Sequence, residues 1–329
     1  MTKRPSIPIE EIEITHFIFH VVHHGEDDPI LLNKTPIGRF EFFFKKRVSE
    51  VINGNSFYFE ENSTLLKEIK LIDENILRFV ETSKKLAQKF HENKDKRIKP
   101  GVMILMRVRI KEIPQFILIK YDHENVLTYT QDGAEAILKE ISNTFSKSKS
   151  ALQKSAIINL QLDQPLAIIV DKSERNNITQ FFKEFLGVFR KYNDKVLTEK
   201  VRNAFLSTVR TFNETLPTDY TSRASYIFYD LVQKNESFER DNFLERIFGE
   251  HYHDEMEVEF DKNLKRNDIT GEEFLFDKSL KRPKELKYKT AEGVLIQYSS
   301  EAEDTVSIVN EPSQTIITIK TTKLVEQKS

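Results

Sequence analysis

The chain of 329 residues carries 50 Lys and Arg against 52 Asp and Glu, is 39% hydrophobic, and contains neither Cys nor Trp. A chain of this length is expected to form two domains or one large one, and to bury enough surface to fold without a metal or a disulfide. The lack of cysteine excludes thiolate catalysis, Cys-ligated zinc, iron–sulfur clusters and disulfides, and favours a reducing, cytoplasmic location. The polar start of the chain and its short apolar runs predict neither a secretory signal nor a membrane span.

Strand and helix patterns are mixed in the first half of the chain. Residues 12–22 alternate between apolar and polar positions, which predicts a half-buried strand, and 30–32 a short one. Apolar residues at helical spacing predict helices over 37–51 and 63–93. Further strands are expected at 102–110, 116–121, 126–129, 155–160 and 166–170, with a helical turn near 134–141. No regular strand–helix–strand alternation appears, so the pattern favours an α+β domain with a mixed sheet over a doubly wound nucleotide-binding fold.

The second half of the chain begins with amphipathic helices. Apolar positions at 178–189, 197–212, 220–234 and 238–248 fall on one face of a helix each. After residue 250 the chain returns to short strand patterns at 274–276, 294–298, 306–309 and 315–321. We therefore expect an α+β domain over residues 1–172, followed over 173–329 by a helical section and a small β region.

Charge is nearly balanced overall, at a formal −2, but it is unevenly distributed. Residues 94–111, 183–210 and 278–289 carry seven, seven and six basic residues against one, three and one acidic, while 250–261 carries six acids and no base. Basic stretches of this kind are usually solvated surface, but several that converge would attract a polyanion. We interpret the acidic run as a loop first, and as a partner site or DNA mimic second.

If the basic stretches bind nucleic acid, the phosphate contacts come from lysine and arginine side chains in the first two of them. An Arg would act as a bidentate fork and a Lys as a point charge. The candidates are Lys94, Lys96, Arg97, Lys99, Lys183, Arg190, Lys191, Lys195, Lys200 and Arg202.

Histidine patterns are too weak to predict a metal site. On a strand, His16 and His20 would share a face but stand about 13 Å apart, too far to share a zinc ion. His251, His253 and Glu255 could hold a divalent ion if they alternated on a strand, and we prefer an ordinary turn. No metal and no cofactor is expected.

Signals for catalysis are similarly sparse. Asp277 followed by Glu285 and Lys287 imitates the acid, Glu-x-Lys pattern of metal-dependent nucleases, but the triplet is common in charged chains. The isolated glycines form no phosphate-binding loop, and no nucleophile-elbow motif occurs. The aromatic run 57–59 could stack on bases, although alternation in a buried strand explains it better. We expect a protein that is not an enzyme.

Three stretches resemble a known family. Residues 152–158, then 165–171 ending in Asp, then 181–187 reading Phe-Phe-Lys-Glu-Phe-Leu-Gly are similar to the NdpA/YejK-type bacterial nucleoid-associated proteins. The likeness extends to the opening strand with His20 and to closing strands at 293–298 and 315–320. It implies a cytoplasmic, nucleoid-located protein that binds double-stranded DNA, forms a homodimer and has no catalytic site. A related branch serves in anti-phage defence.

The leading hypothesis is a nucleoid-associated protein that reads DNA backbone and shape without sequence specificity. An alternative is a protein-interaction or regulatory subunit of a DNA-processing or anti-phage defence complex, which would use the acidic segment 250–261. A Mg²⁺-dependent nuclease built on Asp277, Glu285 and Lys287 is the third.

Overall fold

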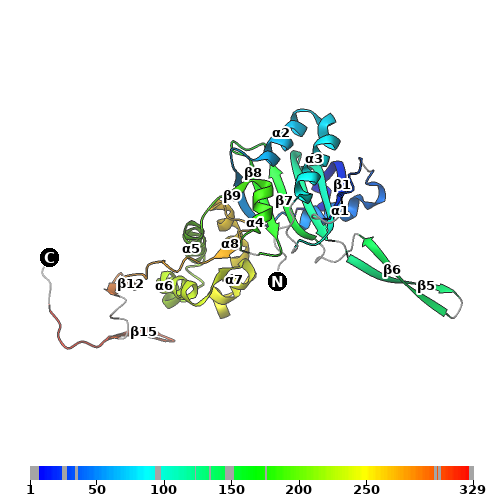
Figure 1. Cartoon of the computed structure of the whole chain (residues 1–329). Helices are drawn as coiled ribbons and strands as arrows, with labels where there is room; N and C mark the ends of the chain where they lie inside the picture. The colour runs from blue at the N-terminus through cyan, green and yellow to red at the C-terminus, as the bar shows by residue number, and fades with distance from the viewer. Residues whose placement is uncertain are drawn as a thin grey trace. The chain divides into compact units, whose positions relative to one another are not determined.

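The computed structural model describes residues 7–23, 28–33, 36–92, 98–122, 124–132, 135–144, 152–174, 176–299, 302 and 305–325 (Figure 1). For residues 122–144, 218 and 310 the description covers the backbone only. The chain divides into two compact units, one formed by residues 1–193 with 271–274 and the other by 194–270 with 275–329. The sequence places the division after residue 172, whereas this clustering keeps the helix and strand that follow with the first unit.

A seven-stranded sheet forms the first unit, and each neighbouring pair of strands in it is antiparallel. The α+β class is therefore confirmed, with an antiparallel rather than a mixed sheet. In spatial order the strands are β1 (Ile12–Val22), β3 (Gly101–Ile110), β4 (Ile113–Asp122), β7 (Leu152–Asn159), β8 (Leu166–Asp171), β2 (Asn55–Phe59) and β9 (Val188–Arg190).

Apolar layers cover both faces of this sheet. In β3, Met103 and Leu105 belong to one buried cluster, while Ile104 and Met106 belong to another. The first cluster includes side chains of α2, α3 and α4, and the second includes side chains of α1. This double burial explains the nearly continuous apolar run of β3. The helices are α1 (Glu41–Glu50), α2 (Thr64–Glu74), α3 (Phe79–His91) and α4 (Gln180–Leu186), with 3₁₀ turns η1 (Ile9–Glu11), η2 (Gly38–Phe40) and η3 (Ile76–Arg78).

The prediction of a single helix over 63–93 is wrong, because the helix is interrupted at Asn75. This residue is extended, with φ −143° and ψ 99°, and its Oδ1 accepts the N–H of Leu77 at 3.1 Å. The side chain thus caps the short turn η3, which redirects the chain into α3. Apolar spacing continues across the break, which is why periodicity alone does not reveal it.

The helical turn predicted near 134–141 is also wrong. Strands β5 (Glu124–Asp132) and β6 (Glu135–Thr144) form a separate antiparallel hairpin, with Tyr129 opposite Leu138 (Figure 1). The segment combines good helix formers with apolar residues, so local propensity misleads and pairing with β5 decides. The strand predicted at 30–32 is reduced to one bridge between Val21 and Ile30.

Helices dominate the second unit, as the sequence predicts. Their shared core is aromatic: the ring centroids of Phe205 and Phe248 lie 5.6 Å apart, and those of Phe243 and Phe260 5.4 Å. The helices are α5 (Asp194–Thr211), α6 (Thr218–Lys234), α7 (Arg240–Phe248) and α8 (Asp254–Arg266), with the turn η4 (Gly249–His251). The acidic run interpreted as a loop therefore lies mostly in α8.

Short strands close the second unit and confirm the small β region. β12 (Glu285–Lys289) pairs with β13 (Leu295–Ser299), and β14 (Val306–Glu311) pairs with β15 (Gln314–Ile319), both antiparallel. β12 contacts α6 and buries Leu286 and Tyr288. Two further strands of two residues each are β10 (Ser237–Phe238) and β11 (Phe274–Leu275).

Candidate nucleic-acid interface

The ten predicted phosphate contacts are distributed over both units. Lys94, Lys96 and Arg97 lie outside the described residues. Lys99, Lys183, Arg190 and Lys191 lie in the first unit, whereas Lys195, Lys200 and Arg202 lie on α5 in the second. Three of them, Lys183, Arg190 and Lys191, fall on or beside the consecutive elements α4 and β9.

Aromatic rings and a lysine gather where β2 and β9 form the end of the sheet. Tyr58 of β2 is the cross-strand partner of Phe189, and their ring centroids are 6.1 Å apart. The Nζ atom of Lys191 lies 5.6 Å from the ring centroid of Tyr58 and 5.3 Å from that of Tyr192. Phe189 is 43% exposed, and the other three are half-buried. We call Tyr58, Phe189, Lys191 and Tyr192 the edge surface.

Flat rings beside an ammonium group are suited to nucleic acid, because rings stack on bases or sugars while the cation contacts phosphate. Alternation within β2 separates Tyr58 from its neighbours: Phe57 is 1% exposed and Phe59 7% exposed, and both belong to the core. The core interpretation of the run 57–59 therefore holds for two of its three residues. Sequence reasoning missed the edge surface because only the pairing of β2 with β9 brings these residues together.

Arg190 has a different role from its neighbour. Its guanidinium forms an ion pair of 2.8 Å with Glu272, and the two side chains are 17% and 1% exposed. It also donates to the carbonyl oxygens of Asn176 and Glu273, at 3.2 and 3.1 Å. Burial raises the pKa of the Glu272 carboxyl, and Arg190 acts in the opposite direction. Arg190 therefore fixes β9 from beneath the edge surface.

The turn between α4 and β9 carries a structural requirement for glycine. Gly187 has φ +63°, and a Cβ atom there would lie 2.9 Å from Cβ and Oγ of Ser63. Lys183, half-buried on α4, accepts the N–H of Gly187 through its carbonyl oxygen at 2.8 Å. Lys99, two residues before β3, is exposed, and its carbonyl oxygen accepts a hydrogen bond from the buried Nζ of Lys120 at 2.7 Å.

The stretches that carry the family resemblance build a buried ion pair. Nζ of Lys154 lies 2.5 Å from Oδ1 of Asp171, with the side chains 5% and 0% exposed. The other carboxylate oxygen accepts the N–H and the hydroxyl of Thr179, at 2.9 and 2.7 Å. The same ammonium lies 5.0 Å from the ring centroid of Phe181. These residues hold the start of α4, and so support the edge surface from within.

The three predicted phosphate contacts on α5 differ in whether their side chains already bind another group of the protein. Lys200 donates through Nζ to the carbonyl oxygen of Asn267 at 2.6 Å, which ties α5 to the end of α8. Arg202 pairs with Glu199 one turn earlier on α5, at 3.3 Å. Lys195 is exposed at the start of the helix. Of the three, Lys195 is the most accessible to a phosphate.

Some acidic residues of the run 250–261 form an internal ion-pair network. Arg240 of α7 contacts both carboxylate oxygens of Asp261, at 2.8 and 2.6 Å, and Glu257 at 2.7 Å. Glu257 also accepts the hydroxyl of Tyr252 at 2.5 Å, and burial, followed by this hydrogen bond, raises the pKa of Tyr252 to about 12. From Asp254 the segment is helical, and Met256, Phe260 and Leu264, buried at helical spacing, give it an apolar face. The acids left exposed at its start are Glu250, Asp254 and Glu255.

The rings of His251 and His253 pack against aromatic side chains. His251 lies in η4 with its ring centroid 5.4 Å from that of Tyr220, and His253 precedes α8 with its ring 5.1 Å from Phe212. They do not alternate on a strand, as a metal site would require. Within the described ranges, no group of three or more His, Asp or Glu side chains is placed to hold a metal ion.

The nuclease-like residues make local contacts. Asp277 accepts the N–H and the hydroxyl of Ser279 at 2.9 and 2.8 Å, and these hydrogen bonds lower the pKa of its carboxyl. Glu285 and Lys287 pair with each other at 3.3 Å on β12, with both side chains at least half exposed. Each group is thus engaged with a close sequence neighbour.

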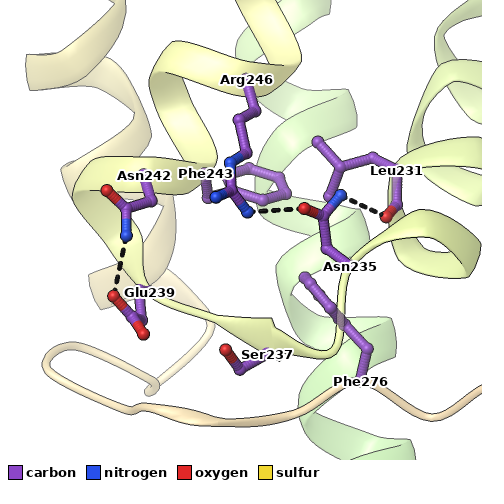
Figure 2. Close-up of a pocket in the computed structure, with 8 residues that line it drawn as sticks. All are labelled: Leu231, Asn235, Ser237, Glu239, Asn242, Phe243, Arg246 and Phe276. Atoms are coloured by element: carbon purple, nitrogen blue, oxygen red, sulfur yellow. Dashed lines mark hydrogen bonds between the residues drawn. The ribbon is translucent and has the colours of Figure 1, made fainter.

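One pocket of about 100 Å³ lies between α6, α7 and the chain after β11 (Figure 2). Its polar groups satisfy one another: Arg246 donates to Oδ1 of Asn235 at 2.5 Å, and Asn235 donates to the carbonyl of Leu231 at 2.8 Å. Ligand pockets are several times larger and present unsatisfied polar groups. We assign no ligand to this one.

Fold and site together define an α+β protein in which an antiparallel sheet unit, ending in an aromatic and basic edge, is joined to a helical unit. A family model described as NA37, nucleoid-associated protein YejK, matches residues 18–325. The chain therefore belongs to this family of nucleoid-associated proteins. A search of curated proteins found no match. Among the helices described, none is both long and apolar enough to cross a membrane.

Proposed function

We propose that this protein binds double-stranded DNA in the nucleoid through the phosphate backbone and shape of the duplex, as a homodimer and without a catalytic step. The observation that carries the proposal is the edge surface, where Lys191 lies between two tyrosine rings and beside an exposed Phe189. Membership of a nucleoid-associated family supports it.

The local contacts rank the candidate phosphate ligands. Lys99, Lys183, Lys191 and Lys195 have the strongest case, because no described carboxylate lies within ion-pair distance of the first two, Lys191 contacts rings, and Lys195 is exposed. Arg190, Lys200 and Arg202 hold internal partners. Lys94, Lys96 and Arg97 stay candidates on charge alone.

A salt titration tests the proposal. Each phosphate neutralised adds about 0.9 to the slope of log affinity against log salt. We expect Lys183→Ala and Lys191→Ala each to reduce the slope for duplex DNA by about one. Lys234→Ala is the matched control, since this exposed lysine pairs with Asp230 on α6. An affinity that does not change with salt would contradict the proposal.

A second candidate is a protein-interaction subunit of a DNA-processing or anti-phage defence complex. It is favoured by the exposure of Glu250 in η4 and of Asp254 and Glu255 in the first turn of α8, none of which belongs to the Arg240 network. The test is co-purification of a partner that survives nuclease treatment. It should be lost when the three exposed acids are changed to amides, and retained when Glu285, outside the segment, is changed to Gln.

A further inference from the structure

The helical segment 38–50, formed by η2 and α1, presents an aromatic side chain between two cations. Arg39, Phe42 and Lys46 follow one another at spacings of three and four residues, which puts them on one helical face. Phe42 is 66% exposed, the most of any phenylalanine described. Arg39 and Lys46 are exposed, and no carboxylate of the described chain forms an ion pair with either. We call these three residues the α1 stripe.

The opposite face of α1 is firmly anchored. Phe44 and Val48 are buried in the core beneath the sheet, and the ring centroid of Phe44 lies 4.6 Å from that of Phe17 in β1. Arg47, 4% exposed, pairs with Glu50 at 2.6 Å. The segment formed by η2 and α1 therefore fixes the backbone of the α1 stripe, so that binding has to order only its three side chains.

The surroundings of Phe42 argue for a narrow occupant. Specific protein interfaces bury roughly 800 Å² on each side around a contiguous apolar centre. Phe42 instead has charged residues one turn away on either side, and the other exposed ring of the segment, Phe40, has its centroid 5.2 Å from Cζ of Arg39, so that it packs against a cation. A single apolar side chain flanked by cations is the arrangement with which architectural proteins enter duplex DNA.

Resting on the proposed function, we propose that Phe42 inserts between base pairs of duplex DNA from the minor groove while Arg39 and Lys46 contact the flanking phosphates. The two cations are seven residues, about 10 Å, apart along the helix. Their side chains reach phosphates on both sides of a minor groove about 6 Å wide. Partial unstacking of one step kinks the duplex, which gives the protein a means to bend DNA as well as to coat it.

The test uses the full chain and a short duplex with a donor and an acceptor dye at its ends and a fluorescent adenine analogue within it. At saturating protein we expect increased energy transfer, from bending, and increased analogue fluorescence, from unstacking. Phe42→Ala should return both signals to those of free duplex and leave the salt slope unchanged. Phe42→Leu should retain the bend, because leucine also serves as a wedge.

Two further variants locate the effect. Leu77→Ala is the control, because Leu77 is an exposed apolar residue of η3 outside the α1 stripe, and this variant should bend DNA as the wild type does. The double variant Arg39→Ala, Lys46→Ala should reduce the salt slope by about two.

The failures are distinguishable. Salt-dependent binding without bending, or an unchanged bend in Phe42→Ala, overturns the wedge and leaves the proposed function standing. A dimer-to-monomer change on Phe42→Ala in sedimentation overturns the wedge in favour of an interface between copies of this chain. If the wild type binds no duplex DNA at any salt concentration, the proposed function and the wedge fall together.

Discussion

The buried ammonium group of Lys154, near the start of β7, shows how single residues secure the proposed interface. Lys154 has its carboxylate partner in Asp171, whose oxygens also accept N–H groups of Ser173 and Thr179 and the hydroxyl of Thr179. The carboxylate thus holds both ends of the loop between β8 and α4. Because both charges are out of water, the pair stabilises the fold only while it is complete.

Removing one member of this pair should be costly. For Asp171→Ala we expect a loss of about 3–5 kcal/mol in the free energy of unfolding, since it leaves a buried ammonium unpaired. Asp230→Ala breaks the exposed pair with Lys234 and should cost less than about 1 kcal/mol. Urea denaturation of the full chain measures both, and equal effects would show that burial of the pair is unimportant.

Burial of His20 should make the stability of the folded protein depend on pH. Its Nδ1 accepts the N–H of Leu32 at 3.0 Å, so Nε2 carries the proton and faces the hydroxyl oxygen of Ser83 at 3.0 Å. Burial, with Lys84 as a smaller cause, lowers the pKa of His20 from 6.5 to about 4. Between these two values the unfolded state binds more protons than the folded state, so stability falls as the pH is lowered.

The expected decrease from His20 is at most about 1.4 kcal/mol per pH unit. It begins as the pH falls through about 6.5 and ends near 4. Urea midpoints measured across this range should fall less steeply for His20→Asn, because an amide does not titrate there. Parallel profiles for the variant and the wild type would refute the assignment.

At the scale of elements, α2, α4 and β9 meet around one serine and one glycine. The hydroxyl of Ser63 donates to the carbonyl of Leu186 at 2.7 Å and accepts the N–H of Leu66 at 3.2 Å. It therefore caps the start of α2 and the end of α4 together. Gly187 makes the close approach possible and immediately precedes the strand β9, which carries Phe189 and is followed by Lys191.

Gly187→Ala should disturb this junction. A left-handed backbone and a Cβ 2.9 Å from Ser63 are expected to cost about 2–4 kcal/mol together. Gly38→Ala is the control, because Gly38 has φ +50° but nothing within 4 Å of its Cβ position, so only the backbone cost of about 1–2 kcal/mol applies. Chemical denaturation compares the two, and a Gly187 variant no worse than the control would contradict the close packing.

At the scale of the whole molecule, the first unit is completed by residues distant in sequence. Glu272 accepts the N–H of Ser56 at 2.8 Å and pairs with Arg190, and the N–H of Glu273 donates to Oδ1 of Asn55 at 2.7 Å. The four residues 271–274 thus return to the edge of the sheet after the chain has formed the helices of the second unit.

Removing the Glu272 carboxylate should weaken the packing of residues 271–274 against the sheet. Glu272→Ala leaves Arg190 without its buried partner, and we expect a loss of about 3–5 kcal/mol in unfolding free energy. Hydrogen exchange should show the loss first in β2 and β9. Glu285→Ala, which breaks an exposed pair with Lys287, is the control and should leave exchange in these strands unchanged. Unchanged exchange in Glu272→Ala would show that the return is dispensable.

Local patterning was sufficient where one period dominates. The strand β3, the amphipathic helices α5 to α7 and the strands β13, β14 and β15 follow from alternation and helical spacing, and so does the α+β class, whereas the strand β12 was not predicted. It was insufficient where a distant partner decides. The hairpin β5–β6 depends on strand pairing, and the break at Asn75 on a single side-chain cap.

For the candidate site, too, some features follow from neighbouring residues and others from tertiary contacts. Composition and spacing were enough for the buried aromatic helix α4 and for a list of cations, because hydrophobic periodicity and charge can be read from neighbouring residues. Which of those cations have internal partners was decided by the tertiary structure: Arg190 pairs with Glu272, Lys200 donates to a carbonyl oxygen, and Lys191 lies against Tyr58. Ion pairs form between groups that are a few ångströms apart in space. The residues that form them can be far apart in the sequence, as Arg190 and Glu272 are, so sequence spacing does not reveal them.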